Sequence, residues 1–401
     1  MDSSLLVAGA GIGGLACALS LGRSGVPVTV LEQADDFAEL GAGIQLGPNA
    51  MRVLSDWGLD ERLRSIASYP DDLCVRDSLD GRQLGHLRLG ATALARFGRP
   101  YACVHRADLH RLLLDALHSR TPATLRLQAR VSTFEIQSDA VLVHLEDGVA
   151  LSGSALIGCD GLWSRVREAL LGTEPAQPTG HLAYRGLIPA ESLSRTARSN
   201  SVQVWLGADM HVVSYPVRSG QWINLVAVVH GRSGASPGRW TQEARVEDLL
   251  TATGPVAANL RALIDAVPRW TLWTLHDRAP LHGPSDLARG RVALLGDAAH
   301  PLRPYLAQGA AMAMEDAWTL GQLVHRTRVR LDWSALFAKY AAHRWERNAR
   351  VQRMSRFNGR IYHARGLLRL GRNAGLRLLG EQLLANRWLY SGPPRLQPGW
   401  S

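Results

Sequence analysis

Short apolar runs of strand length alternate with helical periods along the first 175 residues of this 401-residue chain. Residues 5–8 are an apolar run that follows Ser4, and residues 28–31 are a strand-like run interrupted only by Thr29, which is typical of strands buried on both faces of a parallel sheet. Runs at 154–158 and 291–295 predict two further strands of this kind. Because helical periods such as the apolar face of residues 109–117 separate these runs, the pattern predicts an α/β fold with a Rossmann-like, doubly wound sheet.

The pattern of apolar and polar residues changes between residues 184 and 275. Gly, Ser and Pro separate aromatic-containing β-rich runs there, which predicts an inserted sheet domain with a helical stretch near 243–266. Residues 70–100 show only short apolar alternations and are expected to be irregular, and residues 331–384 are expected to be largely helical. The predicted division is a discontinuous nucleotide-binding domain (1–70, 101–175 and 276–330), a β-rich substrate domain (71–100 and 176–275) and a helical C-terminal segment (331–401).

The first apolar run leads directly into the motif Gly9-Ala10-Gly11-Ile12-Gly13-Gly14. In a strand–turn–helix unit, Gly9 allows the tight turn, Gly11 lets the backbone approach a pyrophosphate, and Gly14 lets the helix pack closely on the strand. Glu32 ends the second run, about 20 residues further on, where a carboxylate binds ribose hydroxyls. We therefore predict a dinucleotide at the N-terminus of the first helix.

Composition places the chain among ordinary globular proteins, with 46% hydrophobic and 20% charged residues. Its apolar first helix falls short of the roughly 18 residues of a membrane span and lacks the basic start of a signal peptide. The cysteines Cys17, Cys74, Cys103 and Cys159 have no spacing typical of a metal site or a disulfide framework. We expect reduced thiols, no metal and a cytoplasmic location.

The net charge of +10 is concentrated at the C-terminal end. From Arg326 onward, fifteen arginines and Lys339 face three carboxylates, a net charge of +13, so the preceding residues carry −3. Arginines recur every third residue from Arg344 to Arg356, which predicts a solvated or dimer-facing helix and a homodimer. No nucleic-acid-binding module accompanies them, so nucleic acid is not an expected partner; contact with an acidic lipid surface is an alternative.

Two further acidic motifs follow apolar strands, Asp160-Gly161 and Gly296-Asp297. Ligands of doubly wound sheets lie beyond the carboxyl ends of the strands, so these aspartates and the glycine turn are predicted to converge on one ligand. The alternative is that Asp160 and Asp297 are helix caps. The occurrence of all three motifs in this order favours the shared ligand.

These motifs resemble those of the single-component FAD-dependent aromatic hydroxylases, the group A flavoprotein monooxygenases. The resemblance covers almost the whole chain and rests on the glycine turn, on residues 159–167 (CDGLWSRVR) and on residues 296–301 (GDAAHP). Salicylate, 3-hydroxybenzoate and 6-hydroxynicotinate hydroxylases are the most similar members, through residues 41–49, 105–109, 184–186, 211–216 and 308–316.

The resemblance implies tightly but non-covalently bound FAD and a transient NAD(P)H co-substrate. Glu32 would hold the adenosine ribose, Asp297 the ribityl chain, and Arg106 the ribityl or pyrophosphate part. Gly43 and Gln45 would lie beside the isoalloxazine, which would meet the backbone near Gly309. The full set of implied cofactor residues is Gly9, Gly11, Gly14, Glu32, Gly43, Gln45, Arg106, Asp160, Asp297, Gly309 and Ala310.

The implied reaction is hydroxylation of a small phenolic aromatic acid, similar to 3-hydroxybenzoate or salicylate, by a flavin C4a-hydroperoxide formed from NAD(P)H and O2. The alternatives are a decarboxylative hydroxynicotinate-type hydroxylase and a flavin oxidase or reductase without oxygen insertion. Pro304-Tyr305 departs from both family patterns, since 3-hydroxybenzoate 6-hydroxylases have a polar residue such as Gln at the first position and the other two groups have Pro-His. The exact acid stays open.

A phenol is far more nucleophilic as its phenolate, so a base within hydrogen-bond reach of the substrate is expected. His211 and Tyr215 share one face of a predicted strand with Val213 and are the catalytic candidates. The alternative is that His211 faces solvent and Tyr215 belongs to the core. Arg303 and Tyr305, on a loop expected to approach the flavin, are candidate substrate contacts, with Arg303 as the receiver of a carboxylate.

Overall fold

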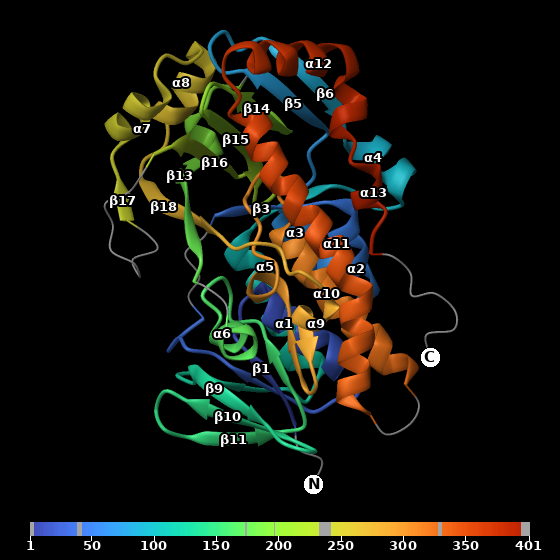
Figure 1. Cartoon of the computed structure of the whole chain (residues 1–401). Coiled ribbons are helices and arrows are strands. Elements are labelled where there is room, and N and C mark those ends of the chain that lie inside the picture. The colour runs from blue at the N-terminus through green and yellow to red at the C-terminus, as the bar shows by residue number, and fades with distance from the viewer. Residues whose placement is uncertain are drawn as a thin grey trace.

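The computed structural model describes residues 4–37, 42–172, 175–195, 197–231, 242–327 and 331–393. Gly41 of the glycine-rich loop lies outside the described residues. The described elements form a lower and an upper lobe, with one long helix running along both (Figure 1). The predicted α/β class with a second sheet and a helical C-terminal segment is confirmed.

A six-stranded sheet in the order β19-β20-β12-β1-β2-β8 forms the centre of the lower lobe. β1 (Leu5–Ala8) pairs in parallel with β2 (Val28–Leu31) and β12 (Leu156–Gly158), and β12 pairs in parallel with β20 (Val292–Leu294). Every residue of β1 is buried, as helices on both faces of a sheet require. The sheet is completed by β8 (Thr124–Arg126) and β19 (Ala288–Arg289).

Helices and two small sheets surround this parallel sheet. α1 (Ile12–Gly22) packs against α5 (Arg106–Arg120) and α10 (Gly309–Arg326), so nearly all of its residues are buried. One small sheet combines β3 (Gly43–Leu46), β7 (Ala102–His105) and β4 (Ala67–Ser68), and the other combines β9 (Val131–Ile136), β10 (Val141–Leu145) and β11 (Ala150–Gly153). The remaining helices of this lobe are α2 (Pro48–Asp56), α3 (Asp60–Ile66), α6 (Arg165–Leu171) and α9 (Pro284–Leu287).

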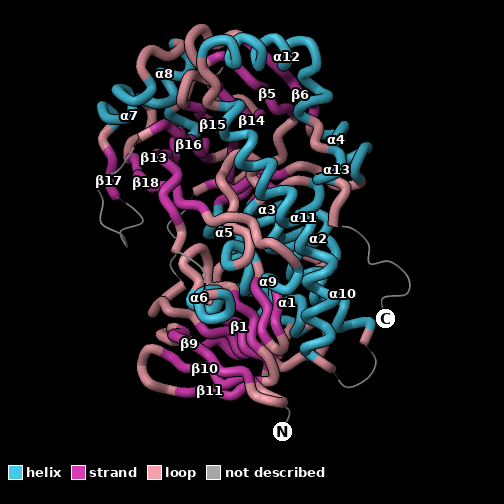
Figure 2. Tube along the Cα trace, in the orientation of Figure 1, coloured by secondary structure: helices cyan, strands magenta, loops and turns pink. Residues whose placement is uncertain are grey.

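The upper lobe is built on an eight-stranded sheet in the order β17-β18-β13-β16-β15-β14-β5-β6. Its centre is antiparallel: β16 (Trp222–His230) lies between β13 (Gln177–Pro189) and β15 (Met210–Val217). β14 (Ser201–Leu206) and β18 (Trp270–Asp277) flank these strands. Figure 2 shows the strands of this sheet above those of the parallel sheet.

Residues 70–100 are ordered, contrary to the expectation of an irregular segment. β5 (Asp72–Asp77) and β6 (Gln83–Arg88) form an antiparallel hairpin, and α4 (Gly90–Phe97) follows it. β5 joins the upper sheet in parallel with β14, so the hairpin is the edge of that sheet. Its residues do not alternate strictly between buried and exposed, which is why a period of two is weak in the sequence.

The predicted helical stretch near 243–266 is divided into three elements. β17 (Gln242–Ala244) extends the upper sheet, α7 (Val246–Thr253) ends at Gly254 with a φ of +64°, and α8 (Ala258–Asp265) follows. Leu249 and Leu260 pack on the apolar face of the upper sheet. These two helices cover the sheet at the upper left of Figure 1.

The C-terminal segment consists of α11 (Trp333–Tyr362), α12 (Gly366–Leu384) and α13 (Arg387–Tyr390). The arginine stripe on α11 differs from the expected solvated face. Arg344 is 1% exposed and pairs with Glu315 and Asp316, while Arg356 donates to Asp277 at 2.8 Å. Arg347 also pairs with Glu315, so these three arginines join α11 to the body of the protein, while Arg350 and Arg353 are exposed. A regular spacing of arginines does not reveal which partners the fold supplies.

Candidate active site

The first of two adjoining cavities has a volume of about 800 Å³ and lies beyond the carboxyl ends of β1, β2 and β12. The three predicted motifs meet here, because Gly11, Glu32, Asp160 and Asp297 all line this cleft. Arg106, the first residue of α5, lies on its wall. The structure thus brings together groups that are up to 286 positions apart in the sequence.

Steric requirements explain the glycines of the turn. A Cβ on Gly9, whose φ is +94°, would lie 2.6 Å from the carbonyl oxygen of Cys159. A Cβ on Gly14 would lie 1.9 Å from the carbonyl oxygen of Gly9, so the helix could not approach the strand. A Cβ on Gly11 would meet no atom of another part of the protein within 4 Å, and Gly11 lines the cleft. The backbone at Gly11 is therefore accessible to a ligand, as pyrophosphate binding at a helix N-terminus requires.

The carboxylate of Glu32 is held by the backbone. It accepts a hydrogen bond from the Ala10 amide at 2.7 Å and another from the Ala34 amide at 2.9 Å. A carboxylate offers about four acceptor positions, so two remain for ribose hydroxyls. Glu32 lines the cleft in an orientation fixed by the glycine turn itself.

Asp160 combines the two roles that the sequence left open. Its carboxylate accepts hydrogen bonds from the amides of Arg165 and Val166 at the start of α6 and from the Ser164 hydroxyl at 2.5 Å. Asp160 therefore stabilises the N-terminus of α6, and it also lines the cleft. Burial raises its pKa despite these hydrogen bonds. Its contact with a cofactor stays a prediction.

The second cavity, of about 330 Å³, adjoins the first and shares Arg106 and Asp297 with it. Asp297 is exposed to these cavities, and the enclosing protein raises its pKa, while His300 and Arg106 partly oppose that effect. One wall comes from the lower lobe, and strands of the upper sheet supply the facing wall. The predicted residues on the lower wall are Gly43, Gln45, Gly309 and Ala310.

His211 and Tyr215 lie together on the facing wall, with Val213 between them. The period of two along β15 brings all three side chains to the cavity. His211 is 2% exposed, and burial lowers its pKa well below the ordinary value, with His363 adding to this effect. The imidazole is therefore neutral at neutral pH, the state in which a histidine can accept a proton.

Tyr215 packs closely against the glycine-rich β3. A Cβ on Gly43 would lie 2.5 Å from the Tyr215 ring, and the Gly43 amide donates to Asn224 Oδ1 at 2.7 Å. Burial raises the pKa of Tyr215, so its phenol stays protonated. Gln45 accepts a hydrogen bond from the Tyr101 hydroxyl at 2.7 Å. Gly43 is therefore required so that β3 can pack directly against the substrate wall.

Arg185 is a residue of this cavity to which the sequence had assigned no role. It lies on β13, lines the cavity, and stacks on Trp273 with its Cζ 4.2 Å from the ring centroid. Its Nε is buried and makes no hydrogen bond within the described part of the chain. Burial lowers the pKa of Arg185 to about 10. A lone arginine within an apolar strand was the signal that could have identified it.

Of the two predicted substrate contacts, Arg303 lies at the cavity and Tyr305 lies behind its wall. Arg303 lines the second cavity, but its Nε donates to Asp277 at 2.8 Å. Tyr305 is 3% exposed and is not part of the cavity lining; its ring lies 5.3 Å from the ring of His211. Tyr305 thus packs beside His211 behind the wall. The predicted substrate contacts of both residues stay predictions.

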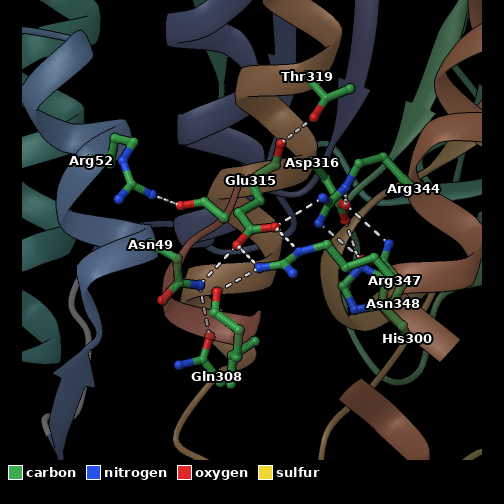
Figure 3. A network of polar contacts seen from close by, with 12 residues as sticks. Asn49, Arg52, His300, Gln308, Glu315, Asp316, Thr319, Arg344, Arg347 and Asn348 are labelled. Atoms are coloured by element: carbon green, nitrogen blue, oxygen red, sulfur yellow. Dashed lines mark hydrogen bonds and ion pairs between the residues drawn. The ribbon is translucent and has the colours of Figure 1, made fainter. Parts of the chain in front are cut away.

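A buried polar network fixes the start of α10 beneath the cavity (Figure 3). Asn49 Nδ2 donates to Gln308 at 2.9 Å and to Glu315 at 2.8 Å. Burial alone would raise the pKa of Glu315, but the adjacent Arg344 and Arg347 outweigh it and lower the pKa. The network joins α2, α10 and α11, and so it positions the Gly309 backbone at the cavity.

Comparison with known proteins identifies the family of this chain. A family model described as an FAD binding domain matches residues 2–355. The chain belongs to this family. A 3-hydroxybenzoate 6-hydroxylase of Polaromonas naphthalenivorans (strain CJ2) is 40% identical over 373 residues, which cover 93% of this chain and 91% of that protein.

Two other relatives extend the comparison. A 6-hydroxynicotinate 3-monooxygenase of Bordetella bronchiseptica is 37% identical over 355 residues, covering 88% of this chain and 91% of that protein. The crystal structure of Klebsiella pneumoniae HpxO complexed with FAD and uric acid has a TM-score of 0.85 and 28% identity, covering 98% of this chain and 97% of that one. The resemblance drawn from the motifs is confirmed: the protein is an FAD-dependent aromatic hydroxylase.

The cleft fits FAD, the cofactor of the family. The bare backbone at Gly11 suits the pyrophosphate, and the fixed carboxylate of Glu32 suits a ribose. Within the described ranges, no group of three or more His, Cys, Asp or Glu side chains is arranged to hold a metal ion. No helix among the described elements has the length and apolar character needed to span a membrane.

Proposed function

We propose that this hydroxylase acts on a small phenolic aromatic acid, similar to 3-hydroxybenzoate or salicylate, with NAD(P)H and O2 as co-substrates. One observation carries the proposal. The cavity next to the cofactor cleft is lined by a neutral buried imidazole, His211, and by an arginine without an ion pair among the described residues, Arg185. These groups match the two polar groups of such a substrate, a hydroxyl and a carboxylate.

His211 would act as the base. Nδ1 of His211 is engaged by His363 at 2.8 Å, so Nε2 is the ring nitrogen available to the substrate hydroxyl. A base that accepts the phenol proton makes the ring electron-rich, and FAD, when bound, supplies the activated oxygen. Tyr215, kept protonated by burial, can donate a hydrogen bond to the substrate.

Arg185 would receive the carboxylate. A desolvated guanidinium gains more from a carboxylate than a solvated one, because the surrounding dielectric is low. Arg303, the earlier candidate, already donates to Asp277, and Arg356 donates to the same carboxylate oxygen. Arg185 is therefore the stronger candidate, and Arg303 would contribute as a second cation at the cavity edge.

The remaining lining excludes water from the reaction. Val213, Val226, Val228 and Leu302 form apolar parts of the wall. A dry site protects a reactive oxygen species from loss to solvent. This lining favours oxygen insertion over a simple oxidase or reductase, the alternative with the same cofactor.

The experiment is a panel of hydroxybenzoates and hydroxypyridine carboxylic acids tested on the FAD-loaded enzyme. We expect one hydroxybenzoate to stimulate NAD(P)H oxidation and to yield a product that carries oxygen from isotopically labelled O2. Peroxide formed in place of a labelled product, with every acid tested, would contradict a hydroxylase. A decarboxylated pyridine product would indicate the hydroxynicotinate reaction instead.

We also propose the domain division drawn from the sequence, a homodimer and a cytoplasmic location. The two large sheets, each with its own buried apolar cluster, support the division. Leu367 and Leu378 on α12 are 85% and 82% exposed, which supports a dimer contact at this helix. Sedimentation of the protein with and without Leu378→Gln tests the dimer, and vesicle co-sedimentation tests the lipid alternative.

A further inference from the structure

The candidate base is the first of four histidines that lead away from the substrate cavity. Nδ1 of His211 lies 2.8 Å from Nε2 of His363, which follows the last residue of α11. The His181 ring on β13 lies 4.8 Å from the His363 ring, and the His230 ring lies 5.4 Å from the His181 ring. His230, the last residue of β16, is exposed. We call this set the histidine file.

The direct hydrogen bond between His211 and His363 contains a single proton. A neutral imidazole has one N–H and one bare nitrogen, so one ring donates and the other accepts. With the proton on Nδ1 of His211, its Nε2 is a bare acceptor toward the cavity and Nε2 of His363 is the acceptor behind it. This is the arrangement required for a proton to enter His211 on one side and leave on the other.

Burial makes a positive charge at His211 costly. It lowers the pKa of His211 well below the ordinary value, that of His363 to about 3 and that of His181 to about 4. A proton taken from a substrate therefore does not remain at His211 as a stable imidazolium, and it has to move outward. The other ionisable groups facing the file are Tyr305, Tyr362, Asp209, Arg303 and Arg372.

Beyond His211, the histidine file contains two buried nitrogen atoms that have no hydrogen-bond partner within the described residues. Nδ1 of His363 and Nδ1 of His181 are both buried and make no hydrogen bond within the described residues. Buried polar atoms are normally paired, so two unpaired nitrogens on neighbouring rings call for an explanation. Asp209 partly opposes the lowering of the pKa of both residues, whereas no carboxylate does so at His211, which favours a positive charge on this outer part of the file over one at the cavity.

We propose that His363 takes the proton that His211 receives from the substrate phenol and passes it through His181 and His230 to solvent. The phenol O–H bond breaks and Nε2–H of His211 forms; Nδ1–H of His211 breaks and Nε2–H of His363 forms. Nδ1–H of His363 then breaks as an N–H bond of His181 forms, His181 passes a ring proton to His230 in the same way, and His230 releases a proton to solvent water. No electrons are transferred. The proposal rests on the proposed role of His211 and makes His363 a positioning and relay residue.

The test follows phenolate formation without turnover. The FAD-loaded enzyme is mixed with its phenolic substrate in the absence of NAD(P)H, and the ultraviolet absorbance of the phenolate is recorded by stopped flow. We expect His363→Gln to slow phenolate formation about 10²-fold, since a positioned proton acceptor contributes about 10²–10⁴-fold. Glutamine keeps a hydrogen bond to His211 but cannot relay a proton, so FAD content and substrate Kd should stay unchanged.

Two further variants separate relay from packing. In His363→Ala, added imidazole should restore the rate of phenolate formation, and the solvent deuterium isotope effect should rise in both His363 variants. The matched control is Tyr362→Phe, because Tyr362 is adjacent on α11 and its ring lies 5.3 Å from the ring of His211. It should form phenolate at the wild-type rate.

The outcomes distinguish the relay from the function on which it depends. A wild-type rate in His363→Gln, or an equal slowing in Tyr362→Phe, would overturn the relay and leave His363 a packing residue. Binding of the true substrate to the wild-type enzyme as the neutral phenol over the whole pH range would instead contradict the proposed base at His211.

Discussion

The cofactor cleft and the substrate cavity adjoin each other, yet they are built from different parts of the chain. Gly9, Gly11 and Gly14 shape the cleft through their backbone and the absence of a Cβ, and a carboxylate held by backbone amides completes it. Polar side chains of the upper sheet, His211 and Arg185 above all, form one wall of the cavity. The cofactor cleft is shaped mainly by backbone, and the substrate cavity presents polar side chains on one wall. Mutations should therefore separate cofactor binding from substrate chemistry.

The largest expected effect is at His211. His211→Ala should lower coupled hydroxylation by about 10²–10⁴-fold, the usual contribution of a positioned base. FAD content should be retained, because the residue lies on the upper sheet and not in the cleft. Product yield per NAD(P)H and FAD absorbance are the measurements. Equal loss of both would show that the two regions are not separable and that His211 is structural.

Arg344 tests the support that both regions share. Arg344→Met removes the guanidinium that pairs with the buried carboxylates of Glu315 and Asp316. Because buried charges without a partner are costly, the free energy of unfolding should fall by about 3–5 kcal/mol. Chemical denaturation of the FAD-loaded protein measures it. Arg353→Met, an exposed position on the same helix, is the control and should change stability little. A similar loss of unfolding free energy in both variants would show that the buried polar network is not the source of the stability.

Arg185 sharpens the comparison on the substrate side. Arg185→Met should weaken binding of the aromatic acid by about 10–150-fold, since a charge-assisted hydrogen bond contributes about 1.5–3 kcal/mol. Substrate titration of the FAD-loaded enzyme gives the Kd, and the FAD Kd should not change. An analogue with a neutral amide in place of the carboxylate should bind the wild-type enzyme and the Arg185→Met variant with the same Kd. Unchanged affinity for the acid would assign the carboxylate to Arg303.

The smallest expected effect is at Glu32 in the cleft. Glu32→Gln keeps the shape and one acceptor oxygen but loses the charge, so FAD affinity should fall by roughly ten-fold, about 1.4 kcal/mol. The aromatic-acid KM at saturating FAD should stay constant. Glu135→Gln on the exposed face of β9 is the control. A change in substrate KM with an unchanged FAD Kd would show that Glu32 serves substrate binding and not cofactor binding.

The two regions also differ in how far sequence reasoning reached. The glycine turn, Glu32 and the two acidic motifs were correctly expected to meet, because each follows a recognisable strand and the rule for doubly wound sheets brings strand ends together. Pairing of His211 and Tyr215 on one wall followed from the period of two along one strand. No role was assigned to Arg185 from the sequence, although it lies in the segment 184–186 that carries part of the resemblance, because the segment alone does not show that its side chain lines the cavity. His363 lies in no recognised motif, so its contact with His211 was not expected.

Two features show why the rest of the structure was not predictable. The edge hairpin at residues 72–88 has no strict alternation, and the arginines of α11 have a spacing that fits a solvated helix equally well. Arg344 is nevertheless buried on a carboxylate pair of α10. Its partners lie about 30 positions away in the sequence, and only the packing of α10 against α11 selects them.

The sequence by itself determined the dinucleotide turn, because the turn depends on local backbone conformation: the positive φ at Gly9 and the missing Cβ at Gly14 both require glycine. The two acidic motifs and the family resemblance then identified the dinucleotide as FAD. Only the tertiary structure decided that Arg185 lies at the same cavity as His211 and that the four histidines form a file. His211, His363 and His181 come from two strands and a helix end, and their contacts depend on sheet register and on where α11 ends. Register and packing are properties of the whole fold, so no local pattern encodes them.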